Sequence, residues 1–122
     1  MRYILLIAIN PQAYAGMSQE AQQQLFKDYY EFTEGIRASG EYVSGDPLHG
    51  AETATTVRVR DGRRHTTDGP FAESKEVLAG YYIVDVASLD RALELAAKIP
   101  DVVSGAVEVR PLMDMDLMTP PA

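Results

Sequence analysis

The sequence contains no cysteine, and this absence removes several kinds of chemistry at once. Disulfide bonds, thiolate catalysis and zinc–cysteine sites all require cysteine side chains. The chain also lacks any apolar run near the roughly 20 residues that cross a bilayer, which argues against a membrane protein. Its opening segment, MRYILLIAINP, has no separate basic stretch and no small-residue cleavage site. We interpret it as a first strand rather than a secretory signal, and expect a cytoplasmic protein.

Positive charge is scarce as well. The chain has 18 acidic and 11 basic residues, a formal net charge of −7. Binding to a nucleic-acid backbone needs a clustered cationic surface, so we expect no nucleic-acid partner. One short basic cluster runs from Arg58 to His65 and is interrupted by Asp61. Either a solvated hairpin or an anion-facing patch explains this cluster.

Histidine is limited to His49 and His65, and no HxxxH or HxH spacing occurs. The sequence therefore predicts no metal site. Glycine-rich dinucleotide and Walker-type loops are absent, as is a serine nucleophile elbow. The sequence thus names no cofactor.

The remaining pattern predicts a single domain over residues 1–122. A continuous apolar run marks a covered strand at 2–9, and VLAGYYIVDV marks another at 77–86. Asp61–Gly62 is a strong two-residue hairpin signal between alternating strands, the first of which we expect to be half-buried through Val57 and Val59. Further strands are expected at 41–48, broken by Gly45, Asp46 and Pro47, and at 105–112.

Two helices complete the prediction. Ser18 caps a helix over about 18–39 that Gly40 ends, and Ser88 caps a second helix that Pro100 ends. The order β-α-β-β-β-β-α-β describes a ferredoxin-like α+β sandwich with both helices on one face of an antiparallel sheet. The strands offer apolar residues to both faces, so we expect a homodimer that covers the second face. The tail, MDMDLMTPPA, is expected to be loose or to dock on a neighbour.

The stretch TTDGPFAESKE, residues 66–76, is dense in turn residues and charges. Asp68–Gly69–Pro70 has turn chemistry, and Phe71 has a simple use as a hydrophobic plug at the sheet edge. Glu73, Lys75 and Glu76 follow along a rim. The stretch is either a connector between strands or a loop that aims carboxylates into a cavity, where they can exchange protons.

The stretch from TATTVRVRDG through DGPFAESKE to VEVRPL resembles the DGPF-motif subgroup of the YCII-related proteins. The resemblance covers nearly the whole chain and implies a ferredoxin-like, dimeric α/β barrel. Some members of that family are suspected enzymes because of a His–Asp pair in a cavity, and some handle small aromatic or lactone-like compounds. The matching histidine is expected near the first helix, and residues 10–40 contain none. Members of the subgroup often accompany extracytoplasmic-function sigma factors.

Polar side chains near the motif are the candidate site residues. Glu108 lies between two valines, on the opposite strand face, and an ion pair with Arg58 or Arg60 is its simpler role. Tyr81 and Tyr82 point to opposite faces, so one of them can line a cavity. The predicted catalytic residues are Asp68, Glu73, Glu76, Glu108 and His49, and the predicted ligand-binding residues are Arg58, Phe71, Lys75 and Tyr82.

Three functions fit these observations. The first is binding of a small aromatic or anionic molecule, with carboxylate-assisted proton transfer. The second is a non-catalytic interaction module linked to a sigma factor, with an acidic surface that meets a basic partner. In the third, the chain is a dimeric scaffold and the DGPF loop serves folding alone. Whether the protein is an enzyme stays open at this point.

Overall fold

The computed structural model describes residues 1–72 and 74–121. The strands follow the order and spacing that the sequence predicts. They are β1 (Arg2–Ile9), β2 (Tyr42–Pro47), β3 (Thr55–Arg60), β4 (Arg63–Asp68), β5 (Val77–Asp85) and β6 (Ala106–Pro111). The α-helices are α1 (Pro11–Tyr14), α2 (Gln19–Ala38) and α3 (Leu89–Ala96), and short 3₁₀ turns are η1 (Ala51–Thr53), η2 (Pro100–Val103) and η3 (Met115–Met118).

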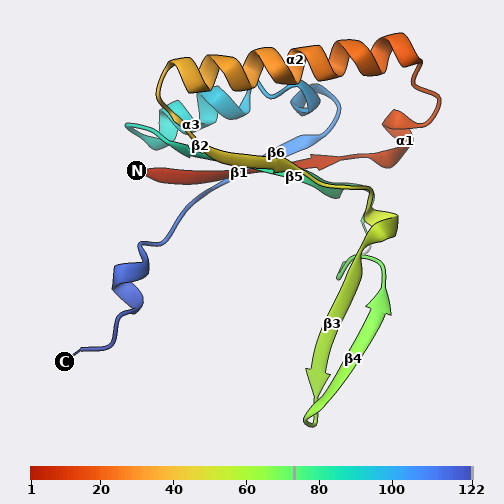
Figure 1. Cartoon of the computed structure of the whole chain (residues 1–122), viewed down its shortest axis with the longest axis vertical. Coiled ribbons are helices and arrows are strands. Elements are labelled where there is room, and N and C mark those ends of the chain that lie inside the picture. The colour runs from red at the N-terminus through yellow and green to blue at the C-terminus, as the bar shows by residue number, and fades with distance from the viewer. Residues whose placement is uncertain (73, 122) are drawn as a thin grey trace.

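Four strands form an antiparallel sheet in the order β2-β5-β1-β6. Figure 1 shows α2 and α3 together on one face of this sheet, while no α-helix of the described residues lies on the opposite face. This strand order, with two β-α-β halves interleaved, is that of a ferredoxin-like sandwich. The predicted α+β fold is confirmed.

The two long helices begin where their capping serines predict. The Ser18 side chain accepts a hydrogen bond from the Ala21 N–H at 3.0 Å, and Ser88 accepts one from Arg91 at 3.2 Å. Each bond satisfies an N–H group that has no partner inside its helix. The short helix α1 was not predicted. Its four residues are too few to show helical periodicity, and Asn10 caps it.

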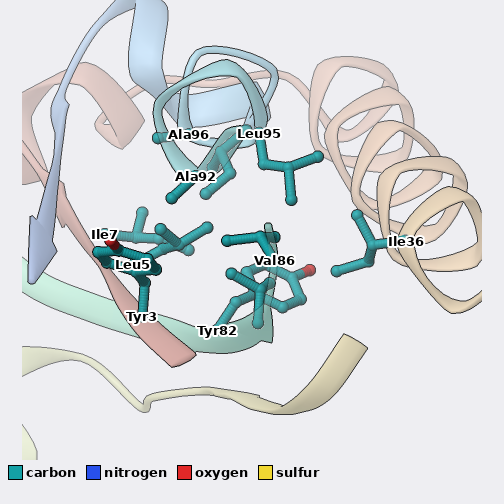
Figure 2. Close-up of a cluster of buried hydrophobic side chains, with 11 residues drawn as sticks. Tyr3, Leu5, Ile7, Ile36, Tyr82, Val86, Ala92, Leu95 and Ala96 are labelled. Carbon is teal, nitrogen blue, oxygen red and sulfur yellow. The ribbon is translucent and has the colours of Figure 1, made fainter. Parts of the chain in front are cut away.

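The core lies between the sheet and the helices, and Figure 2 shows its side chains. Alternation along β1 turns Tyr3, Leu5 and Ile7 toward the helices, and the same alternation on β5 turns Tyr82 and Val84. From the helix layer, the buried residues are Ile36, Ala92, Leu95, Ala96 and Ile99. The other faces of β1 and β5 carry Ile4, Leu6 and Ile83, which are only half-buried.

Strands β3 and β4 form a separate two-stranded sheet. The turn residues Asp61 and Gly62 have φ angles of 53° and 72°, as a tight hairpin turn requires. Figure 1 shows this hairpin standing away from the main sheet on its helix-free side, where the C-terminal tail also lies. Val57 and Val59 are 57 % and 60 % exposed, so the predicted half-buried strand is wrong for the single chain. Among the described residues, no sheet or helix packs against this hairpin.

Strand β2 also differs from its prediction, because it continues through Gly45 and Asp46 to Pro47. The glycine is used for a close approach. A Cβ atom at Gly45 would lie 2.7 Å from a ring carbon of Tyr82 and 2.9 Å from the Tyr81 carbonyl oxygen. The strand is therefore not broken at Gly45, since only glycine lets β2 approach β5 at this point.

Candidate functional site

A cavity of about 480 Å³ lies between α2, α1, η2 and the β2–β5 side of the sheet. Its wall is mainly apolar and aromatic, with a few polar groups, the usual composition of a small-molecule site. The aromatic lining residues are Tyr14, Phe26, Tyr29, Tyr42, Tyr81 and Tyr82, and the polar ones include Thr33, Arg37, Asp46 and Asp101.

The way α2 packs leaves room for this cavity. Near the C-terminal end of the helix, Ile36 is buried in the core, with Phe32 packed against it. Nearer the start, Phe26 is 69 % exposed and Tyr30 is 67 % exposed. The N-terminal half of α2 therefore extends over the sheet without filling the space beneath it.

A buried carboxylate stands at one end of the cavity. Asp101, on η2, is only 7 % exposed. The Tyr14 hydroxyl donates a hydrogen bond to its Oδ1, and the Tyr29 hydroxyl donates to its Oδ2 at 2.5 Å. Hydrogen bonds to an ionised group are roughly twice as strong as neutral ones. This cluster joins α1, α2 and η2 around a single acceptor.

Burial raises the pKa of both tyrosines in the cluster. For Tyr14 and Tyr29 the largest cause is desolvation, followed by the hydrogen bond to Asp101 and its negative charge. Each of these causes opposes formation of a phenolate. Both hydroxyls therefore keep their protons and act as donors to Asp101.

The floor of the cavity is organised around Tyr82. Its hydroxyl lies 2.6 Å from the Thr33 hydroxyl of α2, and its ring meets the Phe32 ring edge-on at a centroid distance of 5.2 Å. Figure 2 shows the Tyr82 ring reaching from β5 toward the helix that carries Ile36. Burial raises the pKa of the Tyr82 hydroxyl. Among the described residues, every buried side-chain N or O atom has a hydrogen-bond partner.

A positive group lines the cavity at the other end. The Arg37 guanidinium carbon lies 4.2 Å from the centre of the Tyr42 ring, a cation–π contact. Arg37 also lies 3.8 Å from Glu34, with half of both side chains exposed. Solvent screens that ion pair strongly. The guanidinium keeps hydrogen-bond capacity for a ligand.

A second hollow, of about 580 Å³, is an open groove between α2 and α3. Its arginine is already engaged, because Arg91 binds Glu41 through two nitrogens at 2.8 and 2.9 Å and Glu94 at 3.0 Å. The hydrogen bond from Arg91 lowers the pKa of Glu41. Because Arg91 is already paired, its guanidinium is not free to bind a ligand in this groove.

Most of the predicted site residues lie outside the cavity. Asp68, Lys75, Glu76 and His49 are exposed, on or next to the hairpin and its connections. Glu73 lies outside the described residues. Tyr82, which the sequence predicts to be a ligand-binding residue, lines the cavity. The roles assigned to the exposed residues stay predictions.

The predicted contacts of the motif also differ. Phe71 is 80 % exposed, so it is not a plug within its own chain. Its carbonyl oxygen accepts a hydrogen bond from Arg58 at 3.3 Å. Glu108 pairs with Arg110 on its own strand rather than with Arg58 or Arg60. Both members of that pair lie on the helix-free face, opposite the cavity.

The sequence interpretation missed the Asp101 cluster. Tyr14 and Tyr29 are 87 and 72 positions from Asp101, so no local pattern joins them. One signal was present, because Asp101 is a lone carboxylate in the apolar segment IPDVV. A carboxylate there has either to turn outward or to find donors.

Two features are absent from the described part of the chain, residues 1–72 and 74–121. No group of three or more His, Asp or Glu side chains is arranged to hold a metal ion. No described helix combines the length and the apolar character that crossing a membrane takes.

Comparison with known proteins assigns the family. The model of the YCII-related domain matches residues 1–116. The chain belongs to the YCII-related family. An uncharacterized protein of Rhizobium meliloti is 32 % identical over 114 residues, which cover 92 % of each chain.

A solved structure shares the fold. It is 5-chloro-2-hydroxyhydroquinone dehydrochlorinase, TftG, of Burkholderia phenoliruptrix, in complex with 2,5-dihydroxybenzoquinone. The TM-score is 0.56, at 14 % identity, over 93 % of this chain and 94 % of the other. At that identity the likeness shows a common fold and leaves the reaction of this chain to its own residues.

Proposed function

We propose that this YCII-related protein binds a small ring compound in the cavity beneath α2, and that it works as a homodimer. The observation that carries the proposal is the cavity itself, an aromatic-lined space with a buried carboxylate at one end. Cavities of 300–1,000 Å³ suit small organic ligands. Tyrosine and phenylalanine rings offer flat faces against which a planar ligand packs.

Asp101 is the carboxylate that we assign to proton transfer. It is buried, whereas Asp68, Glu76 and Glu108 are exposed to water. A buried carboxylate can take a proton from a ligand bound beside it. In that step a C–H bond of the bound ring compound breaks, its electron pair stays on the ligand, and the carboxylate becomes a carboxylic acid. The tyrosine hydroxyls then carry the hydrogen bonds that hold the acid in place.

A second copy of the chain is the partner that best fits the helix-free face of the sheet. That face carries Ile4, Leu6 and Ile83, and the segments beside it expose large apolar side chains. These exposed side chains are Val57, Val59, Phe71, Met113, Met115, Leu117 and Met118. Apolar surface on this scale is typical of an interface.

Charge supports the same arrangement. The hairpin carries Arg58, Arg60, Arg63 and Arg64, none of them in an ion pair with a described acidic side chain. The tail alternates acidic and apolar residues in the segment 113–118. Figure 1 shows the hairpin and the tail on the same side of the sheet. In a dimer through this face, the hairpin of one copy lies near the tail of the other.

Calorimetric titration with small phenols and aromatic acids tests the proposed function. Thr33→Met would place a larger side chain in the cavity wall and is expected to abolish binding. Gln23→Met, exposed on the same helix and outside the cavity lining, is the matched control and should bind as the natural protein does. If no ring compound binds, or if both variants bind equally, the cavity is not a ligand site and the interaction-module alternative takes its place.

A further inference from the structure

The hydrogen atoms of the Asp101 cluster are already committed. A tyrosine hydroxyl has one proton to donate and lone pairs to accept with. The Tyr14 proton points to one oxygen of Asp101 and the Tyr29 proton to the other. What remains at this end of the cavity is therefore a set of acceptors: two tyrosine oxygens and the free lone pairs of a carboxylate.

A cluster of this kind discriminates between ligands by their protonation state. A ligand hydroxyl can donate into it, which satisfies both partners. A ligand oxyanion brings no proton and meets the negative charge of Asp101, so it is repelled. The raised pKa values of Tyr14 and Tyr29 keep this arrangement intact across the physiological range.

The opposite end has the opposite character. Tyr29, Thr33 and Arg37 recur at intervals of four along α2, so they share one face of the helix and all three line the cavity. Eight residues of α-helix rise about 12 Å. The acceptor cluster and the guanidinium of Arg37 thus stand at separate ends of one elongated site. Arginine is well suited to a carboxylate, to which it can donate two parallel hydrogen bonds.

We infer that the cavity selects a ring compound with an un-ionised hydroxyl at the Asp101 end and an anionic group at the Arg37 end. The inference rests on the proposed function, because it names the ligand class of the same cavity. It also states which protonation form binds. A hydroxylated aromatic acid is the simplest member of this class.

The first part of the test compares three probes by calorimetry: 4-hydroxybenzoate, benzoate and phenol. We expect 4-hydroxybenzoate to bind about tenfold or more tightly than either of the others, because each lacks one polar anchor. Asp101→Asn should remove the advantage over benzoate, and Arg37→Gln the advantage over phenol. Asp90→Asn is the matched control, since Asp90 is exposed on α3 and does not line the cavity.

The second part uses 4-nitrophenol, whose ionisation is visible as colour. We expect the bound probe to have a raised pKa, so its affinity for the natural protein falls as the pH rises through the pKa of the free probe. A probe bound as the coloured phenolate, with a lowered pKa, would show that the cluster offers donors and would overturn the inference.

The outcomes separate the two proposals. If ring compounds bind without any preference for the hydroxyl, the inference fails while the proposed function stands. If no ring compound binds, both fail together. If Asp101→Asn does not fold, the 4-nitrophenol titration of the natural protein decides the inference by itself. A purely structural role for Asp101 would alter the stability of that variant and leave the probe preferences unchanged.

Discussion

At the scale of single residues, Asp101 has a double task. It fixes α1 and α2 to η2 through Tyr14 and Tyr29, and it supplies the buried charge of the cavity. A half-satisfied buried carboxylate is costly, so the two tyrosines are as necessary to the fold as to any ligand. A change at Asp101 should therefore alter the stability of the N-terminal half of α2 as well as ligand binding.

The pH dependence of stability follows from the same residues. Tyrosine ordinarily has a pKa of 10.0, and the folded chain raises the pKa of both Tyr14 and Tyr29 above that value. The stabilisation is complete below pH 10 and is lost as the pH rises toward the folded-state pKa, because the unfolded chain then releases protons that the folded chain retains. We expect the melting temperature to fall steeply above pH 10.

The measurement is thermal unfolding followed by circular dichroism between pH 8 and about pH 12. A Tyr14→Phe, Tyr29→Phe double variant should show a shallower decline above pH 10 than the natural protein. Tyr30→Phe is the control, since Tyr30 is 67 % exposed on the same helix. Parallel declines in the natural protein and the double variant would contradict the assignment.

The site itself could not be predicted from the sequence, and the reason lies at this scale. The hydrogen-bond donors of Asp101 come from α1 and α2, which are distant from it in the sequence, so only the tertiary structure brings them together. The DGPF motif, in contrast, can be recognised from eleven consecutive residues. Turn chemistry at Asp68–Gly69 is local and was predicted correctly, since Gly69 has a φ angle of 102°. The sequence predicts Phe71 as a hydrophobic plug at the sheet edge, but its side chain is 80 % exposed in the single chain.

At the scale of elements, local signals predicted most of the fold. The serines at 18 and 88, the Asp61–Gly62 turn and the apolar strands each specify structure within a few residues. The misses need tertiary information. Helix α1 is one turn long, and β2 continues through Gly45 because the neighbouring strand β5 supplies its hydrogen bonds.

Two glycines in different elements should respond oppositely to alanine. At Gly45 in β2 a methyl group would collide with the Tyr82 ring, and overpacking of this kind costs about 1–3 kcal/mol. At Gly35 in α2 nothing lies within 4 Å of the new methyl group, and alanine in a helix interior adds about 0.5–1 kcal/mol of stability.

Urea unfolding of the two variants measures this difference. We expect the midpoint of Gly45→Ala to fall and that of Gly35→Ala to rise relative to the natural protein. Equal midpoints for the two variants would mean that the β2–β5 contact relaxes at no cost. The Gly45 variant should also bind ring compounds less well, because Tyr82 forms part of the cavity wall.

At the scale of the whole molecule, the fold is asymmetric. One face of the sheet is covered by two helices, while the other bears half-buried apolar residues beside a projecting hairpin and tail (Figure 1). A second sheet packed against that face would remove this surface from water. We therefore expect the protein in solution to have twice the 13.4 kDa mass of one chain.

Analytical ultracentrifugation of a matched pair of variants tests the dimer. Leu6→Asp puts a charge in the centre of the helix-free face and should yield the mass of one chain. Val103→Asp puts the same charge on η2, in the helix layer, where the residue is 90 % exposed, and should leave the dimer unchanged. A natural protein that sediments as a single chain at micromolar concentration would rule out this assembly.

The projecting hairpin has one more consequence. A two-stranded sheet without a packed face is only marginally stable in water, so β3 and β4 should open far more often than the core strands. The backbone amides of one chain would then exchange with solvent deuterium on two distinct timescales. If a second copy covers the hairpin, the fraction of molecules whose hairpin amides exchange slowly should grow with protein concentration. Deuterium exchange of the backbone amides at residues 55–68 would thus measure dimer formation without an attached dye or tag.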